Sequence, residues 1–381
     1  MLVILPKHVG YGRRATLTDS CSAIIVVLAL GLMSQTKAAP ISEPLLRSAE
    51  VTPLGQHAVM ESVCLAGTRV VAVGERGIVL LSDDEGQHWR QVQTPVSVTL
   101  TAVQFVDAQY GWAVGHSGVV LFSEDGGAHW LRQLDGEQAA QLALSEARTA
   151  TTLSTITNAQ RLVREGADKP FLSLSFVDRR HGTIVGAYGL AMHTDNGGRT
   201  WQSWVARMDD GRALHLYAVR QRADKIWVVG EQGFIASSAD GGATFERVQS
   251  PYKGSFFALD VAPTGTVTIA GLGGNAYRTN NNGASFTRLV IDGSEAFTDV
   301  WYSPNGEWLI SNQTGQVFQS RDDARNFASL IERPLAPVNG VVKTGSGAVI
   351  SAGFGGVNLV RPARQETAGG VASANRSGGR Q

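Results

Sequence analysis

The chain contains 381 residues, and its 33 Lys plus Arg balance 33 Asp plus Glu, so the formal net charge at pH 7 is zero. A neutral chain offers no overall field that would attract nucleic acid or an anionic membrane. Its eight histidines are scattered without the spacing of zinc ligands, so we predict no metal site and no cofactor.

Residues 1–39 have the order of a secretory signal peptide. An Arg13-Arg14 pair precedes an apolar run from Ala23 to Met33, and small residues follow up to Ala39. The apolar run is too short to span a bilayer comfortably as a helix. We therefore expect an exported, periplasmic protein. An uncleaved N-terminal anchor is the alternative, and the choice between Sec and twin-arginine export stays open.

The two cysteines predict no internal disulfide. Cys21 lies inside the expected signal peptide, which leaves Cys64 alone in the mature chain. We expect Cys64 to be a small buried apolar residue rather than a nucleophile.

Six eight-residue segments of one pattern, here called Asp-boxes, recur along the chain. The clearest runs from Ser123 to Trp130 and combines Ser, an Asx residue, glycine and a closing aromatic. The Asx side chain accepts hydrogen bonds from the N–H groups of its own turn, and the aromatic anchors that turn in a core. We therefore assign a structural role, and no catalytic role, to the six Asx residues Asp84, Asp125, Asn196, Asp240, Asn281 and Asp322.

A second feature sets the period of the repeat. Fifteen residues before each closing aromatic stands a recurring position, usually glycine, and another glycine follows three residues later. Seven such pairs recur about every 41 residues, with one longer step of 71 between Gly115 and Gly186. Two glycines that bound a two-residue step between apolar runs indicate a tight hairpin turn.

Seven units of four short strands predict an all-β protein, a seven-bladed β-propeller of four-stranded blades over residues 40–361. The seventh unit lacks its closing Asp-box. We expect residues 44–51 to supply the missing outer strand of that blade, which would remove an exposed edge. Residues 362–381 are rich in Gly, Ser, Ala and Arg and predict a disordered tail.

These repeats resemble the photosystem II stability and assembly factor family, whose members are seven-bladed propellers with BNR-type, Asp-box repeats. The resemblance is carried by motifs such as residues 112–118 followed by 123–130, and it covers about residues 50–360. The stretch 166–171 is similar to the non-photosynthetic bacterial members. The resemblance implies a non-catalytic assembly factor that binds a membrane-protein client on its exported side, which is the thylakoid lumen in phototrophs.

The longer step between blades 2 and 3 predicts an inserted helical arm over residues 137–169. Its start is rich in Ala, Gln, Leu, Glu and Arg, and four apolar residues can line one side of a helix. These four are Leu142, Leu153, Ile156 and Val163.

Propeller topology places the glycine-bounded turns, the links between blades and the arm on one rim, opposite the Asp-boxes. We predict that this rim binds the client. The turn-tip candidates are Glu75, Arg76, His116, Tyr188, Glu231 and Phe354, and the basic candidates after the arm are Lys169, Arg179 and Arg180. The alternative for each is a solvated turn residue that has no partner.

The alternative function is carbohydrate binding or a sialidase-like glycoside hydrolase, because sialidases also carry Asp-boxes on a propeller. Such an enzyme needs an arginine cluster, a tyrosine nucleophile and a glutamate. Tyr188 or Tyr217 with Glu75 or Glu231 are the candidates. The recurring inner positions are instead apolar and are expected to be core, namely Val103, Phe105, Leu174, Phe176, Leu259, Val261 and Val300. A structural adhesion module is a third possibility. We expect a monomeric, non-catalytic binding protein.

Overall fold

A computed structural model describes residues 43–148, 153–208 and 211–362. The chain divides into two units, residues 1–41 and 42–381, and every described residue lies in the second. The predicted signal peptide and the predicted tail from residue 363 onward lie outside the described residues.

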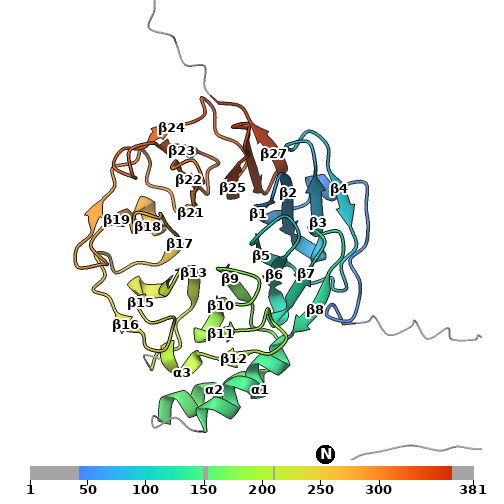
Figure 1. The fold of residues 1–381 in the computed structure, drawn as a ribbon, viewed down its shortest axis with the longest axis vertical. Coiled ribbons are helices and arrows are strands. Elements are labelled where there is room, and N and C mark those ends of the chain that lie inside the picture. The colour runs from blue at the N-terminus through green and yellow to red at the C-terminus, as the bar shows by residue number, and fades with distance from the viewer. Residues whose placement is uncertain (1–42, 149–152, 209–210, 363–381) are drawn as a thin grey trace, which may run out of the picture. The chain divides into compact units, whose positions relative to one another are not determined.

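Seven antiparallel sheets surround a central axis, so the prediction of a seven-bladed propeller is confirmed (Figure 1). Among the described residues, six sheets have four strands, and the seventh has three. In each blade the first strand lies nearest the axis, and the following strands lie progressively further out.

The strands of blades 1 and 2 are β1 (Met60–Ala66), β2 (Arg69–Gly74), β3 (Val79–Ser82), β4 (Arg90–Val92), β5 (Leu100–Phe105), β6 (Gly111–Gly115), β7 (Val120–Ser123) and β8 (Leu131–Leu134). Those of blades 3 and 4 are β9 (Phe171–Phe176), β10 (Gly182–Gly186), β11 (Ala191–Thr194), β12 (Gln202–Ser203), β13 (Leu216–Arg222), β14 (Lys225–Gly230), β15 (Ile235–Ser238) and β16 (Glu246–Arg247).

Blades 5 and 6 contain β17 (Phe256–Val261), β18 (Val267–Gly271), β19 (Ala276–Thr279), β20 (Thr287–Arg288), β21 (Phe297–Tyr302), β22 (Trp308–Asn312), β23 (Val317–Ser320) and β24 (Ala328–Ser329). Blade 7 contains β25 (Val338–Lys343), β26 (Val349–Gly353) and β27 (Gly356–Val360).

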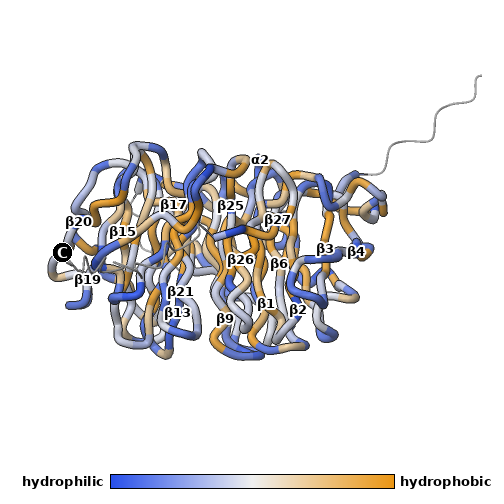
Figure 2. The backbone as a smooth tube through the Cα atoms, turned by 90° about the horizontal axis from the view of Figure 1, so that it is seen from above, coloured by the Kyte–Doolittle hydropathy of each residue, from blue (hydrophilic) through white to orange (hydrophobic). Residues whose placement is uncertain are grey.

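The second strand of each blade is almost entirely buried because neighbouring blades cover both of its faces. All five residues of β6, for example, are buried. Figure 2 shows hydrophobic strands through the thickness of the propeller and hydrophilic turns along its two faces. The apolar inner positions predicted as core, such as Leu174, Leu259 and Val300, are each at most 3% exposed.

Adjacent blades are joined by packed aromatic and aliphatic side chains. Between blades 2 and 3 the rings of Trp112 and Phe176 stack at 3.7 Å with planes 4° apart. Such contacts recur around the propeller and give each junction its own apolar cluster.

The glycine pairs at the turns answer two different demands. A Cβ on Gly74 would lie 2.2 Å from the carbonyl oxygen of Val59, so only glycine lets the chain entering the blade pass this close. Gly77 has a φ of +74°, which side chains rarely adopt. The two glycines together let the turn lie directly against the link between blades.

The insertion between blades 2 and 3 forms two helices, α1 (Gly136–Ala147) and α2 (Leu153–Glu165), and we call residues 136–165 the helical arm. Asp135 and Gln138 start α1 with a reciprocal capping box. The arm packs beside β12 and the short helix α3 (Val205–Met208), on the outer side of blade 3 (Figure 1).

The side of the arm that is buried differs in part from the predicted one. Leu142, Ile156 and Val163 pack against the cluster between blades 2 and 3, as expected. Leu153 is 78% exposed, so its inclusion was wrong. Small residues such as Ala143 and Ala159 are buried in this cluster instead.

The predicted completion of blade 7 by residues 44–51 was also wrong. Within the described residues, β27 pairs only with β26. The N–H of Ala49 donates to the carbonyl of Thr94 at 3.0 Å, and the N–H of Ser97 donates to that of Pro44 at 2.8 Å. The segment therefore follows the outer side of blade 1.

None of the helices in the described part of the chain is long and apolar enough to cross a membrane.

Candidate functional site

The turns between the second and third strands of the blades lie at the end of the propeller where the blades are linked. Met60, which begins β1, pairs with Gly74, which ends β2, so the turn at residues 75–77 lies beside the link that enters the blade. We call this end the turn-tip face. The opposite end carries the Asp-boxes.

Two predicted tips, Glu75 and Glu231, are engaged in holding the links. Glu75 Oε1 accepts a hydrogen bond from the N–H of Val59 at 3.0 Å, and Glu231 Oε2 accepts one from His215 at 3.2 Å. Each carboxylate satisfies a backbone donor just before the first strand of its blade. These hydrogen bonds give Glu75 and Glu231 a structural role that does not require a client.

Tyr188 is a contact between blade 3 and the helical arm. Its ring packs edge-on against His215 at 4.7 Å, and the Arg161 guanidinium lies 4.9 Å from the ring centre. The Lys169 ammonium lies 5.1 Å from the same centre. Two cations over one tyrosine fix the base of the arm to the turn.

Lys169 is not an exposed contact for a client. It is 7% exposed, and its ammonium pairs with Glu165 at 3.0 Å and with Asp168. Burial alone would lower the pKa of Lys169, but the hydrogen bonds to these two carboxylates raise it. The Lys169 ammonium is therefore paired within the chain, at the base of the arm. This corrects the prediction that Lys169 is available to a partner.

Arg179 and Arg180 lie on the face opposite the other candidates. They occupy the turn between β9 and β10, and the register of Phe176 with Gly182 puts this turn at the Asp-box end. Arg179 pairs with Asp107 at 2.7 Å, and its guanidinium lies 4.1 Å from the Tyr110 ring centre. Neither arginine shares the turn-tip face, which corrects the sequence prediction.

Three predicted tips remain exposed, and they lie on consecutive blades. Phe354 belongs to blade 7, Arg76 to blade 1 and His116 to blade 2, and Phe354 is 61% exposed. Arg76 has a φ of 54°, so its backbone adopts the left-handed conformation at the tip of the turn. We call these three residues the exposed arc.

The six Asx residues of the Asp-boxes share one hydrogen-bond pattern at the opposite face. Asp125 Oδ1 accepts from the N–H of His129 at 2.9 Å and from the Ser123 hydroxyl at 3.0 Å. Asn196 makes the same bond to the N–H of Thr200 at 3.0 Å. In blade 1, hydrogen bonds from His88 and Ser82 lower the pKa of Asp84 to about 2.

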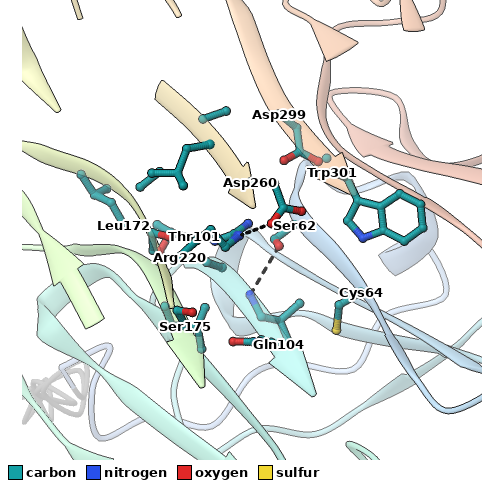
Figure 3. A pocket seen from close by; sticks show the side chains of 18 of the residues that line it. Ser62, Cys64, Thr101, Gln104, Leu172, Ser175, Arg220, Asp260, Asp299 and Trp301 are labelled. Atoms are coloured by element: carbon teal, nitrogen blue, oxygen red, sulfur yellow. Dashed lines mark hydrogen bonds and ion pairs between the residues drawn. The ribbon is translucent and has the colours of Figure 1, made fainter. Parts of the chain in front are cut away.

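The central channel is a polar cavity that the sequence analysis did not predict. It has a volume of about 460 Å³ and is lined by the first strands of the blades. Figure 3 shows Arg220, Asp260 and Asp299 pointing toward one another across it. In sequence these residues are only the polar positions that alternate with apolar core positions along the first strands. That alternation is the one signal that could have indicated them.

Polar side chains of the channel join each blade to the next. Ser62, Gln104, Ser175, Asp260 and Asp299 accept from the N–H groups of Val103, Phe176, Gln221, Tyr302 and Val341 at 2.7–3.4 Å. Arg222 and Asn339 donate to the carbonyls of Val261 and Met60, both at 3.1 Å. All seven junctions thus have such a bond. The innermost strands are edges, and these side chains satisfy their backbone groups.

Two partly buried carboxylates of the channel, Asp260 and Asp299, both have raised pKa values. Desolvation raises the pKa of Asp299 to about 6, against the opposing effects of the Val341 N–H and Arg220. Desolvation also raises the pKa of Asp260, although Arg220 lies 3.6 Å away and lowers it. Desolvation raises the pKa of the half-buried Cys64 thiol, which disfavours a thiolate nucleophile.

The channel lining includes Tyr217, the alternative candidate nucleophile, together with Arg220 and Arg222. Burial and the neighbouring Glu231 raise the pKa of Tyr217, which opposes its use as a nucleophile. The channel arginines Arg220 and Arg222 donate to backbone carbonyls of Val219 and Val261. Over residues 43–148, 153–208 and 211–362, no group of three or more His, Cys, Asp or Glu is arranged to hold a metal ion.

The family model described as photosynthesis system II assembly factor YCF48 matches residues 81–157 and 153–334. A photosystem II assembly lipoprotein Ycf48 of Synechococcus sp. (strain CC9902) is 26% identical over 149 residues, which are 39% of this chain and 45% of the relative. The chloroplastic stability/assembly factor HCF136 of Oryza sativa subsp. japonica is 22% identical over 190 residues, 43% of this chain and 46% of the relative. The chain thus spans about half the length of the curated relatives it matches.

Among solved structures, YCF48 bound to D1 peptide superposes with a TM-score of 0.58 at 15% identity, over 84% of this chain and 97% of that one. At this identity the likeness supports the fold alone. The family model, by contrast, extends from blade 1 to the end of blade 6. The chain therefore belongs to the photosystem II assembly factor YCF48 family.

Proposed function

We propose that this chain is an exported, non-catalytic assembly or accessory factor that binds a segment of a membrane-protein client. Family membership supports an assembly role. A neighbour of the same fold is described as bound to a D1 peptide, which makes peptide binding a reasonable expectation for this propeller as well. The proposal includes a periplasmic location, or the thylakoid lumen in a phototroph, and a monomeric state.

The observation that carries the proposal is the exposed arc on the turn-tip face. Phe354, Arg76 and His116 present an aromatic ring, a guanidinium and an imidazole on three neighbouring blades. Exposed aromatic and arginine side chains are the residues that most often dominate binding energy at protein interfaces. The chemistry suits a client segment that places an apolar side chain next to a carboxylate.

The absence of a catalytic role is supported by how the polar groups of the channel are used. Asp260, Asp299 and Arg222 bond the backbone of the neighbouring blade, and these bonds hold the ring closed. A group committed to such a bond is a poor candidate for proton transfer to a substrate.

The test compares client capture by variants of the arc in the native host. We expect Phe354→Ala with Arg76→Ala to reduce recovery of the crosslinked membrane protein at least tenfold, since each truncation removes an anchor of about 1–2 kcal/mol. Val177→Ala is the matched control, because Val177 is an exposed apolar residue in the β9–β10 turn of the Asp-box face. Equal capture by all variants would contradict the proposal.

A further inference from the structure

The junction between blades 6 and 7 differs from the other six. At each of the others, the closing aromatic of an Asp-box packs into the apolar cluster between the blades. These six aromatics are Trp89, Trp130, Trp201, Phe245, Phe286 and Phe327. Among the described residues, the cluster between blades 6 and 7 contains no Asp-box aromatic.

The missing aromatic follows from the sequence of blade 7. Each Asp-box begins at the last residue of a third strand, as Ser320 does in β23. The residue 41 positions later is Arg361, which directly follows β27. Pro362 follows it, and residue 368, where the aromatic would stand, is Ala368. Blade 7 therefore lacks the Asp-box pattern in its sequence, and among the described residues, which end at 362, it has three strands.

A cavity of about 630 Å³ lies at this junction, and Gln319, Phe327, Leu330, Val349 and Pro362 are among its lining residues. Val349 occupies the position that in blade 1 is Val70, which shares a cluster with Trp89. The cavity is therefore bordered by a residue whose equivalent packs with a closing aromatic. Its size lies within the roughly 300–1,000 Å³ of ligand pockets.

A polar atom in this cavity wall also lacks a partner. The amide nitrogen Nε2 of Gln319 is buried and makes no hydrogen bond. A buried donor without an acceptor costs about 1–3 kcal/mol, so an acceptor placed beside it would be favoured. The backbone of an added chain segment would provide a carbonyl.

The adjacent strand β27 is an open edge. Within residues 43–362 it pairs on one side only, and Leu359 on it is 45% exposed. An unpaired strand edge is the surface on which extended peptides add as a further strand, and apolar side chains in the wall of the adjacent cavity can receive one side chain of such a peptide.

We propose that an extended segment of another protein completes blade 7, pairing with β27 and placing an aromatic side chain in the cavity between blades 6 and 7. This is a second binding site, and it stands on the symmetry of the blades rather than on the exposed arc. Residues 44–51 are bonded to blade 1 and are not available. Residues 363–381 contain no Phe, Tyr or Trp, so they lack the side chain that fills the other six junctions.

The probe is a fluorescent synthetic peptide with the sequence of residues 82–92, which is the Asp-box and fourth strand of blade 1. It carries the aromatic and the strand that blade 7 lacks. We expect saturable binding to the full chain by fluorescence polarisation, and at least tenfold weaker binding of the peptide with Trp89→Ala, because a large buried aromatic is lost. No saturable binding up to about 1 mM, the weak end of the specific range, would overturn the proposal.

Two variants locate the probe. Leu359→Lys puts a charge on the open edge, and Gln319→Trp fills the cavity, so both should abolish peptide binding. Leu131→Lys is the matched control, since Leu131 is 65% exposed on β8, the outer strand of a complete blade. Circular dichroism and thermal unfolding verify that each variant is folded. Equal binding by Leu131→Lys and Leu359→Lys would overturn the assignment.

Two other occupants give distinct results. If a chain ending at residue 362 bound the peptide at least tenfold more tightly than the full chain, the site would belong to residues 363–381. If sedimentation showed a dimer that Leu359→Lys dissociates, a second copy would be the occupant. Either result would overturn the proposal, whereas a monomer whose affinity is independent of residues 363–381 supports it.

Discussion

The hydrogen bonds of the Asp-box in blade 2 make a quantitative prediction for the Asp125→Ala variant. Asp125 Oδ1 accepts from the His129 N–H at 2.9 Å and from the Ser123 hydroxyl at 3.0 Å. Oδ2 contacts the His129 ring at 2.6 Å, but that ring is 88% exposed, and exposed ion pairs contribute little. The variant loses mainly the backbone cap.

We estimate the loss at about 1–2 kcal/mol, the usual effect of removing a side-chain cap of a backbone N–H. For a propeller of this size, such a loss corresponds to a decrease in Tm of about 2–8 °C. Thermal unfolding followed by circular dichroism measures it, with a urea titration to obtain the free energy of unfolding.

Asp125→Asn is the matched control, because it keeps the Oδ1 acceptor. This chain already uses the amide in that position, where Asn196 and Asn281 accept from Thr200 and Ser285 at 3.0 and 3.1 Å. The Asn variant should unfold within about 0.5 kcal/mol of the parent, and client capture by folded Asp125→Ala should be unchanged. Equal destabilisation by Asn and Ala, or lost client capture without lost stability, would refute the structural role of Asp125.

Asp299→Asn should change how the free energy of unfolding depends on pH. The pKa of Asp299 is about 6 in the folded state and about 4 in the unfolded state, so the parent gains stability as the pH falls from 7 to 4. The Asn variant keeps the acceptor for the Val341 N–H but should lack this gain in urea titrations at several pH values. Asp84 and Asp240 should give a pH dependence of the opposite sign, because hydrogen bonds lower the pKa of each to about 2. Their contribution to stability is present above pH 4 and is lost between pH 4 and 2. The double variant Asp84→Asn with Asp240→Asn should therefore flatten the acid-unfolding curve over that range. Arg161→Ala should speed hydrogen exchange in α2 while Tm falls by only a few degrees, because the contact with Tyr188 contributes about 0.5–1 kcal/mol, and unchanged exchange would contradict that anchoring role.

The repeats predicted the blades because the strand and turn signals of each blade lie within a single repeat of the sequence. The steps of about 41 residues, the glycine pairs and the closing aromatics are local features, and together they define seven blades. The inserted helices were also predicted, although the exposure of Leu153 was not, because the core against which the arm packs comes from blades 2 and 3.

The candidate site was predicted less well, since its outcome depends on partners distant in sequence. Arg179 is bound by Asp107, 72 residues away, and the channel bond between Asn339 and Met60 spans 279 residues. Lys169 resembled a free cation until the fold placed it against Tyr188. Periodicity identifies a turn tip, but only the fold decides whether its side chain is already engaged.

The packing of the arm changes the expectation for its removal. An arm that served only to dock a client could be deleted without loss of the fold. In the structure, Ala139, Ala159 and Leu162 are buried in one cluster with Trp112 and Trp201. Deleting the arm would expose that cluster and should lower stability by several kcal/mol, at about 25 cal/mol per Å² of apolar surface exposed.

The most direct test of client binding is site-specific photocrosslinking in the native host, with the photoreactive residue at Phe354 on the turn-tip face or at Val177 on the Asp-box face. Both positions are exposed apolar sites, at 61% and 38%. The proposed function predicts that Phe354 crosslinks one membrane protein and that Val177 does not. Identical products from the two positions, or no membrane protein from Phe354, would contradict it.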